Sequence, residues 1–100
     1  MGASGVKVIG EVAIVKFAKK HAFSRKPLAR FLGVARAANW RHFPDVRTSF
    51  PSADYAPLTG TIIFDIGGNK YRLTARADFD EQLLFIQQVL THEEYDRENF

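Results

Sequence analysis

The sequence contains no cysteine, one methionine and one tryptophan among its 100 residues. Without cysteine the chain has no disulfide framework and no thiolate metal ligand, so a reducing compartment is the expected environment. No apolar run approaches the roughly 20 residues that a membrane-spanning helix needs. The first 17 residues also lack the apolar stretch of a signal peptide, because Lys7, Glu11 and Lys16 interrupt them. We therefore expect a cytoplasmic protein without membrane contact.

Internal repeats, low-complexity tracts and linkers are also missing. The hydrophobic content of 46% in 100 residues is sufficient for one modest core. We predict a single domain over residues 1–100, with residues 1–5 as a flexible lead.

Negative charge is scarce before residue 77. Residues 1–76 carry thirteen lysines and arginines against four acids, whereas residues 77–100 carry one arginine against seven acids. A basic body indicates a polyanionic partner, most often nucleic acid. On charge alone, an ordinary solvated surface is an equally good interpretation.

Hydrophobic periodicity predicts an α+β fold, a helical hairpin packed on a small, mainly antiparallel sheet. The order is β-α-α-(short α)-β-β-β-α. The expected elements are a strand at 6–9, helices at 10–22 and 25–38, a short helix at 43–50, strands at 61–66, 69–77 and 83–91, and a final short helix from 92.

Turn and capping residues set the predicted boundaries. Ser24 is expected to cap the second helix, and Thr91 to cap the last one. Gly67-Gly68 is expected to form a two-residue hairpin turn. Trp40 and Phe43 are expected to anchor the short third helix to the core.

The strand predicted at 69–77 is the most informative stretch for function. Alternate residues of a strand point to opposite faces. One face then carries apolar residues suited to a core, and the other carries Lys70, Arg72, Thr74 and Arg76. We call these four residues the phosphate cradle, because arginine and lysine bind phosphate oxygens well. The alternative is that Asp65 on the neighbouring strand, or the acidic C-terminal tail, neutralises these cations.

Histidine is the remaining candidate for chemistry. His92 follows the last strand at a strand-to-helix boundary, with Tyr95 one turn along, and histidine is the usual general acid or base near neutral pH. A capping or surface role for His92 is equally consistent with its position. His21 lies on an apolar stripe and is expected in the core. Three histidines without matching spacing predict no metal site, and we expect no cofactor.

Two motifs of the C-terminal forty residues resemble HigB-type toxins of bacterial toxin–antitoxin modules, in the RelE/ParE-like superfamily. The first is Phe64-Asp65-Ile66-Gly67-Gly68-Asn69-Lys70-Tyr71-Arg72-Leu73, and the second is Val89-Leu90-Thr91-His92-Glu93-Glu94-Tyr95-Asp96. The upstream segment from Trp40 to Asp54 is also similar to theirs, so the resemblance covers about residues 6–100. The chain departs from the family pattern at Gln87 and Gln88, where a basic residue and an aromatic are usual.

The resemblance implies a RelE-like toxin that cleaves mRNA on the ribosome without a metal, by attack of the ribose 2′-hydroxyl on the adjacent phosphate. It also implies a cognate antitoxin, expected to be a helix-turn-helix protein encoded by an adjacent gene. Arg72 and Arg76 would then stabilise the phosphate, Lys70 would activate the nucleophile, and His92 would protonate the leaving group. The expected RNA contacts are Asn69, Thr74, Tyr95, Arg41 and Arg47.

Two other functions fit the same residues. One is a non-catalytic module that binds the antitoxin or the ribosome. The other is a toxin with another target, such as gyrase, because superfamily members differ in target.

Overall fold

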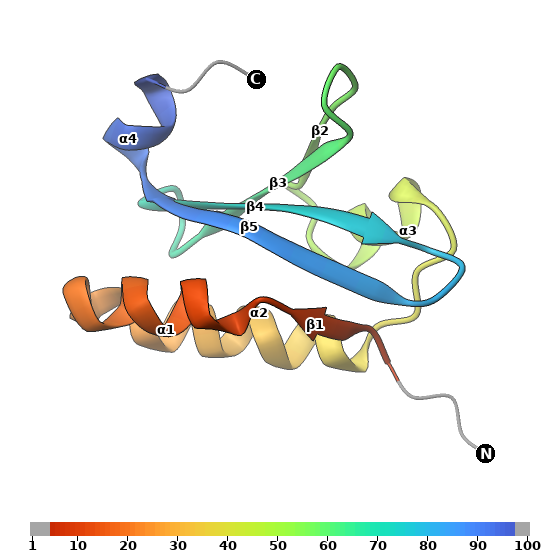
Figure 1. Ribbon diagram of the computed structural model, residues 1–100, viewed down its shortest axis with the longest axis horizontal. Coiled ribbons are helices and arrows are strands. Elements are labelled where there is room, and N and C mark those ends of the chain that lie inside the picture. Colours follow the sequence, from red (N-terminus) through yellow and green to blue (C-terminus); the bar gives the residue numbers. More distant parts are fainter. Residues whose placement is uncertain (1–4, 98–100) are drawn as a thin grey trace.

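The computed structural model describes residues 5–97, and its sheet lies between two long helices on one side and a short C-terminal helix on the other (Figure 1). A short 3-10 turn (Ala22–Ser24) links the two long helices. In chain order the elements are β1 (Lys7–Ile9), α1 (Glu11–Lys20), α2 (Arg25–Ala37), α3 (Phe43–Ser49), β2 (Asp54–Ala56), β3 (Thr61–Ile66), β4 (Tyr71–Asp78), β5 (Leu83–Thr91) and α4 (His92–Arg97).

The five strands have the spatial order β1-β5-β4-β3-β2. All neighbours are antiparallel except β1 and β5, which are parallel. The predicted α+β class, with a helical hairpin against a mainly antiparallel sheet, is confirmed. The predicted order omitted β2, because this strand has only three residues and lies between Pro51 and Pro57, where no two-residue period is visible.

The core fills the space between the sheet and the helices α1 and α2. The apolar stripes predicted for both helices are buried there, including Phe17 of α1 and Phe31 of α2. Phe64 of β3 is fully buried, with its ring 4.9 Å from that of Phe31 and 5.1 Å from that of Phe50. This aromatic cluster fixes the sheet on the helical layer.

Trp40 anchors α3 as predicted. Its ring is buried and stacks on Phe64, and its indole N–H donates a hydrogen bond to Ser49 Oγ at 3.0 Å. Phe43 is half-buried beside the ring of Tyr55. The third helix is therefore tied to the core at both ends.

The two predicted caps have different outcomes. Ser24 does not cap α2, because its hydroxyl donates instead to the carbonyl of His21 at 2.6 Å and closes the 3-10 turn. Thr91 does cap α4: the Glu94 N–H donates to Thr91 Oγ1 at 3.1 Å, and the Thr91 N–H donates to the Glu94 carboxylate at 2.9 Å. This reciprocal pair is a capping box.

The hairpin between β3 and β4 is longer than predicted. β3 ends at Ile66 and β4 begins at Tyr71, so residues 67–70 form the connection. Gly67, Gly68 and Asn69 all have positive φ, at 65°, 69° and 112°. Glycine adopts this conformation without steric cost, which explains the Gly-Gly pair. Lys70 consequently lies in the turn rather than on the strand.

No helix within residues 5–97 is long and apolar enough to cross a membrane. The flexible lead predicted at 1–5 lies, for residues 1–4, outside the described part of the chain.

Candidate active site

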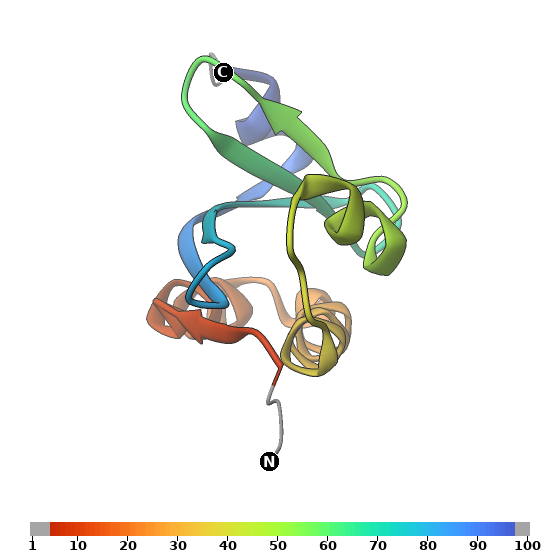
Figure 2. The same ribbon diagram turned by 90° about the vertical axis from the view of Figure 1, so that its right-hand side faces the viewer.

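Three of the candidate residues, Arg72, His92 and Tyr95, lie together on the face of the sheet opposite α1 and α2. The β2–β3 hairpin rises above one part of this face and α4 above another (Figures 1 and 2). α4 contacts the ends of β4 and β5, which brings His92 and Tyr95 to the end of the strand that carries Arg72.

Arg72 is held on three sides. Only 8% of the surface of Arg72 is exposed to solvent. The guanidinium Nε lies 3.2 Å from Asp65 Oδ1, on the register partner of Arg72 in β3. A second nitrogen donates to the backbone carbonyl of Asn69, and a third to its side-chain carbonyl. The ring of Tyr95 lies over the guanidinium carbon, 5.3 Å from it. Asp65 therefore pairs with Arg72, one of the two possibilities that the sequence left open.

His92 joins the turn at residues 67–70 to α4. Its backbone N–H donates to the Lys70 carbonyl at 3.0 Å. Its Nε2 lies 3.5 Å from Asp96 Oδ2, one helical turn along α4. Its Nδ1 is buried and has no hydrogen-bond partner within residues 5–97. Because Nδ1 is buried, Nε2, which lies beside the Asp96 carboxylate, is the ring nitrogen that could exchange a proton with a substrate.

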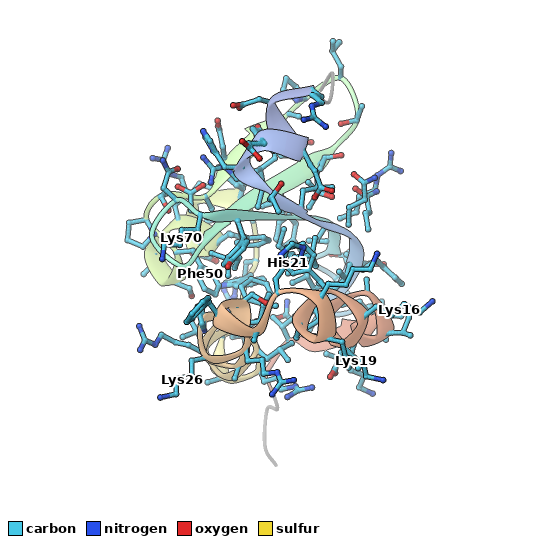
Figure 3. The ribbon with its side chains drawn as sticks, turned by 90° about the vertical axis from the view of Figure 1, so that its left-hand side faces the viewer. Lys16, Lys19, His21, Lys26, Phe50 and Lys70 are labelled. Atoms are coloured by element: carbon cyan, nitrogen blue, oxygen red, sulfur yellow. The ribbon has the colours of Figure 1, made fainter. Side chains whose placement is uncertain are left out.

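The phosphate cradle is not the open row of groups that the sequence predicts. Thr74 is 0% exposed, so the prediction of an accessible hydroxyl is wrong. In register it lies between Ile63 of β3 and Gln88 of β5, under a sheet face that its neighbours close. Lys70 is exposed at the outer end of the sheet (Figure 3), and Arg76 is exposed on β4 beyond a register shift at Thr74/Ala75.

The opposite face of β4 is as predicted. Tyr71, Leu73, Ala75 and Ala77 all pack against the core. Alternation thus identified the direction of each side chain correctly. It did not show that neighbouring strands and α4 would cover part of the polar face.

The remaining predicted RNA contacts are divided between two places. Asn69 lies beside Arg72 and accepts its hydrogen bond. Arg41 precedes α3, and its backbone N–H donates to Asp45. Arg47 is on α3 and donates to the Pro51 carbonyl at 3.3 Å. Because α3 and α4 lie at opposite ends of the sheet (Figures 1 and 2), the structure does not bring Arg41 and Arg47 to His92.

Sequence reasoning missed two acidic residues of α4. Asp96 lies four residues after His92, the spacing that places two side chains on one helix face, and this signal could have identified it. Glu94 completes the capping box. The hydrogen bond that its carboxylate accepts from the Thr91 backbone lowers the pKa of Glu94 below its ordinary value, and the Thr91 hydroxyl bond contributes in the same direction.

The other candidates for chemistry are structural. His21 is half-buried, and its ring stacks on Phe17 with 4.2 Å between centroids, in agreement with the predicted core position. Within residues 5–97, no group of three or more histidine and acidic side chains could hold a metal ion.

Comparison with known proteins gives consistent matches. Residues 24–98 match the family model HigB toxin, described as the RelE-like toxic component of a toxin–antitoxin system. The mRNA interferase toxin HigB of Escherichia coli strain K12 is 38% identical over 52 residues, 51% of this chain and 50% of that relative. A protein named mRNA interferase HigB from Shigella flexneri matches equally well, so the chain spans about half the length of the curated relatives it matches at this identity. Another mRNA interferase HigB, from Escherichia coli O6:H1 strain CFT073, is 24% identical over 91 residues, 90% of this chain and 88% of that relative.

Proposed function

The chain belongs to the HigB toxin family, the RelE-like toxic components of toxin–antitoxin systems, and on this premise we propose that it is an mRNA interferase. It would cleave mRNA on the ribosome and so inhibit translation. We propose that residues 1–100 act as one RelE-like toxin domain. Its antitoxin would be a helix-turn-helix protein encoded beside its gene.

One observation carries this proposal: a preorganised cation and an oriented imidazole lie at the same end of β4. Asp65 and Asn69 fix the Arg72 guanidinium. The Lys70 carbonyl holds the backbone of His92, and Asp96 lies beside its imidazole. Cleavage by an internal 2′-hydroxyl requires positive charge where the phosphorane develops and a proton for the departing oxygen. Arginine and histidine supply these two requirements.

The roles follow from exposure and from the contacts of each group. Arg76 is exposed on β4 four residues beyond Arg72, away from His92, and would bind phosphate oxygens of the message along this face. Arg72 is buried and bonded to its neighbours, so it would act on the phosphate through its electrostatic field, which the Asp65 carboxylate partly offsets. Lys70 would accept the proton of the 2′-hydroxyl as O2′ attacks phosphorus and the P–O2′ bond forms. His92 would donate a proton to the 5′-oxygen as the P–O5′ bond breaks, leaving a cyclic phosphate on the upstream product.

Tyr95 would contribute to the same reaction by positioning the RNA next to Arg72. Its ring lies over the guanidinium and is half-buried. An aromatic ring in this place offers a stacking surface for an unpaired base. Stacking would fix the nucleotide next to the cleaved bond, which agrees with a single-stranded message as the substrate.

The test is cleavage of a defined message in a cell-free translation reaction, with new 5′ ends mapped by primer extension. We expect His92→Gln and Arg76→Ala each to reduce the rate of cutting by about a hundredfold, the usual effect of losing one group that stabilises the transition state. The matched control is His42→Gln. His42 is an exposed histidine that precedes α3 and lies 3.7 Å from Asp45, much as His92 lies near Asp96. If the His92→Gln variant cut the message as fast as the control variant, His92 would not be the general acid.

A non-catalytic module is the second candidate, and the Arg72–Asp65 ion pair favours it because pairing weakens the positive field of the site. A folded wild-type chain that binds ribosomes and blocks translation without new 5′ ends would establish that function. Inhibition of gyrase without any effect on translation would identify a different target.

A further inference from the structure

β5 has an open edge on the side of β1. β1 pairs only with Leu83, Leu84 and Phe85, although β5 continues to Thr91. Within residues 5–97, no strand pairs with residues 86–91 on that side. Thr91 N–H is occupied by the Glu94 carboxylate, so the open edge consists of the outward-facing backbone N–H and C=O groups of residues 86–90.

Gly10 is the residue at which the chain leaves this edge. It has φ of 90°, and a Cβ atom at this position would lie 3.1 Å from the carbonyl oxygen of Ile86. Only glycine fits such a left-handed approach without strain. The chain then turns into α1, which runs beneath the continuation of β5 rather than pairing with it (Figure 1).

The open edge lacks most of the features that protect natural edge strands. Lysine, proline and inward charge are the usual protection, and the segment Ile86-Gln87-Gln88-Val89-Leu90 has none of them. Within this segment, β5 is irregular at the register shift opposite Thr74/Ala75, where Thr74 pairs with Gln88 and Ala75 with Ile86. An exposed edge of this kind is a template for a strand from another chain.

A groove of about 560 Å³ lies between this edge and α1. Phe17, Val89 and Leu90 contribute apolar surface, and Lys16, Lys19 and Lys20 of α1 contribute positive charge. All three lysines are exposed, and Figure 3 shows Lys16 and Lys19 on the same helix that carries His21 at its end. Among residues 5–97, Glu94 of α4 is the one acidic residue that lines the groove.

We propose that the open edge of β5 and this groove bind an extended acidic segment of the cognate antitoxin, which pairs with residues 86–90 as an additional strand. Its alternate apolar side chains would enter the groove, and its carboxylates would meet Lys16, Lys19 and Lys20. The proposal rests on the toxin–antitoxin assignment made above.

The chemistry of the groove favours a polypeptide over RNA. A strand edge offers hydrogen-bonding groups at the spacing of a peptide backbone, and side-chain pockets on alternate residues add specificity. Single-stranded RNA requires accessible aromatic faces for stacking. Of the two rings that line the groove, Phe17 is buried, and the half-buried ring of His21 is already stacked on it.

The first measurement is amide hydrogen exchange of the full chain, alone and with the antitoxin encoded next to its gene. We expect amides of residues 86–90 that face the open edge to exchange at least tenfold more slowly in the complex. Protection confined to other segments would overturn the inference while leaving the toxin–antitoxin pair intact. An antitoxin that does not bind at all would overturn the pair itself. Protection of these amides by a single-stranded oligouridylate, but not by the antitoxin, would identify the groove as an RNA site.

The second measurement compares two charge reversals of equal size. Lys16→Glu/Lys20→Glu removes two cations of the groove, and Lys26→Glu/Arg30→Glu removes two exposed cations at the same spacing on α2. We expect the first variant to reduce the antitoxin association rate at least tenfold at low salt, and the second less than threefold. Equal effects would mean that net charge, and not this groove, attracts the antitoxin. Circular dichroism checks that both variants are folded.

Discussion

The two faces of β4 bury their side chains by different means. Toward α1 and α2, Leu73 and Ala75 are fully buried among apolar neighbours. Toward α4, Arg72 and Thr74 are buried as well, but Arg72 is held by an ion pair and by hydrogen bonds. One strand therefore contributes to an apolar core on one side and to a polar network on the other.

The difference teaches where stability and where function reside. Apolar burial is non-directional and tolerates small shifts, whereas an arginine paired with a carboxylate has a fixed geometry. The register of β3 and β4 places Asp65 opposite Arg72, so the packing of the core face determines the geometry of the polar face. Substitutions on the core face should then cause a large loss of stability throughout the domain, and substitutions on the polar face should cause a smaller, local loss.

The largest expected effect comes from the core face. Phe64→Ala removes a fully buried ring that contacts Phe31, Phe50 and Trp40. Such truncations cost about 3–5 kcal/mol, a large part of the stability of a small domain. Urea unfolding measures the change. The control is Phe85→Ala, because Phe85 is 41% exposed and should lose less than about 1 kcal/mol. Similar losses of unfolding free energy for both variants would contradict the expected difference between a buried and an exposed phenylalanine.

A smaller effect is expected from the polar network. Asp65→Asn leaves the buried Arg72 guanidinium without its carboxylate, which should lower the free energy of unfolding by about 1–3 kcal/mol. Adding Arg72→Met to this variant removes the unpaired charge and should restore part of the loss. Urea unfolding of the two single variants and the double variant gives the coupling energy. Strict additivity would show that the pair does not act as a unit.

A substitution at Thr74, on the polar face, is expected to increase stability. Its hydroxyl is buried and has no hydrogen-bond partner within residues 5–97. A buried unsatisfied hydroxyl is unfavourable, so Thr74→Val should raise the free energy of unfolding by up to about 1 kcal/mol. Thermal denaturation of both proteins tests this. A clear loss of stability would mean that an ordered water satisfies the hydroxyl.

Much of this architecture was predictable because it depends on local pattern. The two-residue period of β3, β4 and β5 and the apolar stripes of α1 and α2 require only the sequence. The capping box at Thr91 and Glu94 has the same local origin. Ser24 shows the limit, because a short polar side chain can bond the helix or the preceding turn, and only the tertiary structure decides.

The candidate site was predictable in its residue types but not in its environment. Arg72 and His92 were identified from strand alternation and from position. Their partners were harder, because the Arg72–Asp65 pair depends on the register of two strands and the Tyr95 contact on where α4 lies. The exposure of Lys70 follows from the length of the turn, and the burial of Thr74 follows from the strands on either side of it, neither of which periodicity encodes.

The smallest expected effect concerns α4, the weakest support of the polar face, which has no buried residue of its own. The Thr91 hydrogen bonds lower the pKa of Glu94. A carboxyl whose pKa is lowered by folding stabilises the folded form above its unfolded pKa, and this contribution is lost as the pH falls through the folded value. Acidification should therefore loosen α4 and withdraw Tyr95 from Arg72. Backbone chemical shifts of residues 91–96, followed through the acidic range, measure the change. The Glu94→Gln variant keeps His92 and Asp96 but lacks this titration, so identical curves for it and the wild type would exclude Glu94 as the cause.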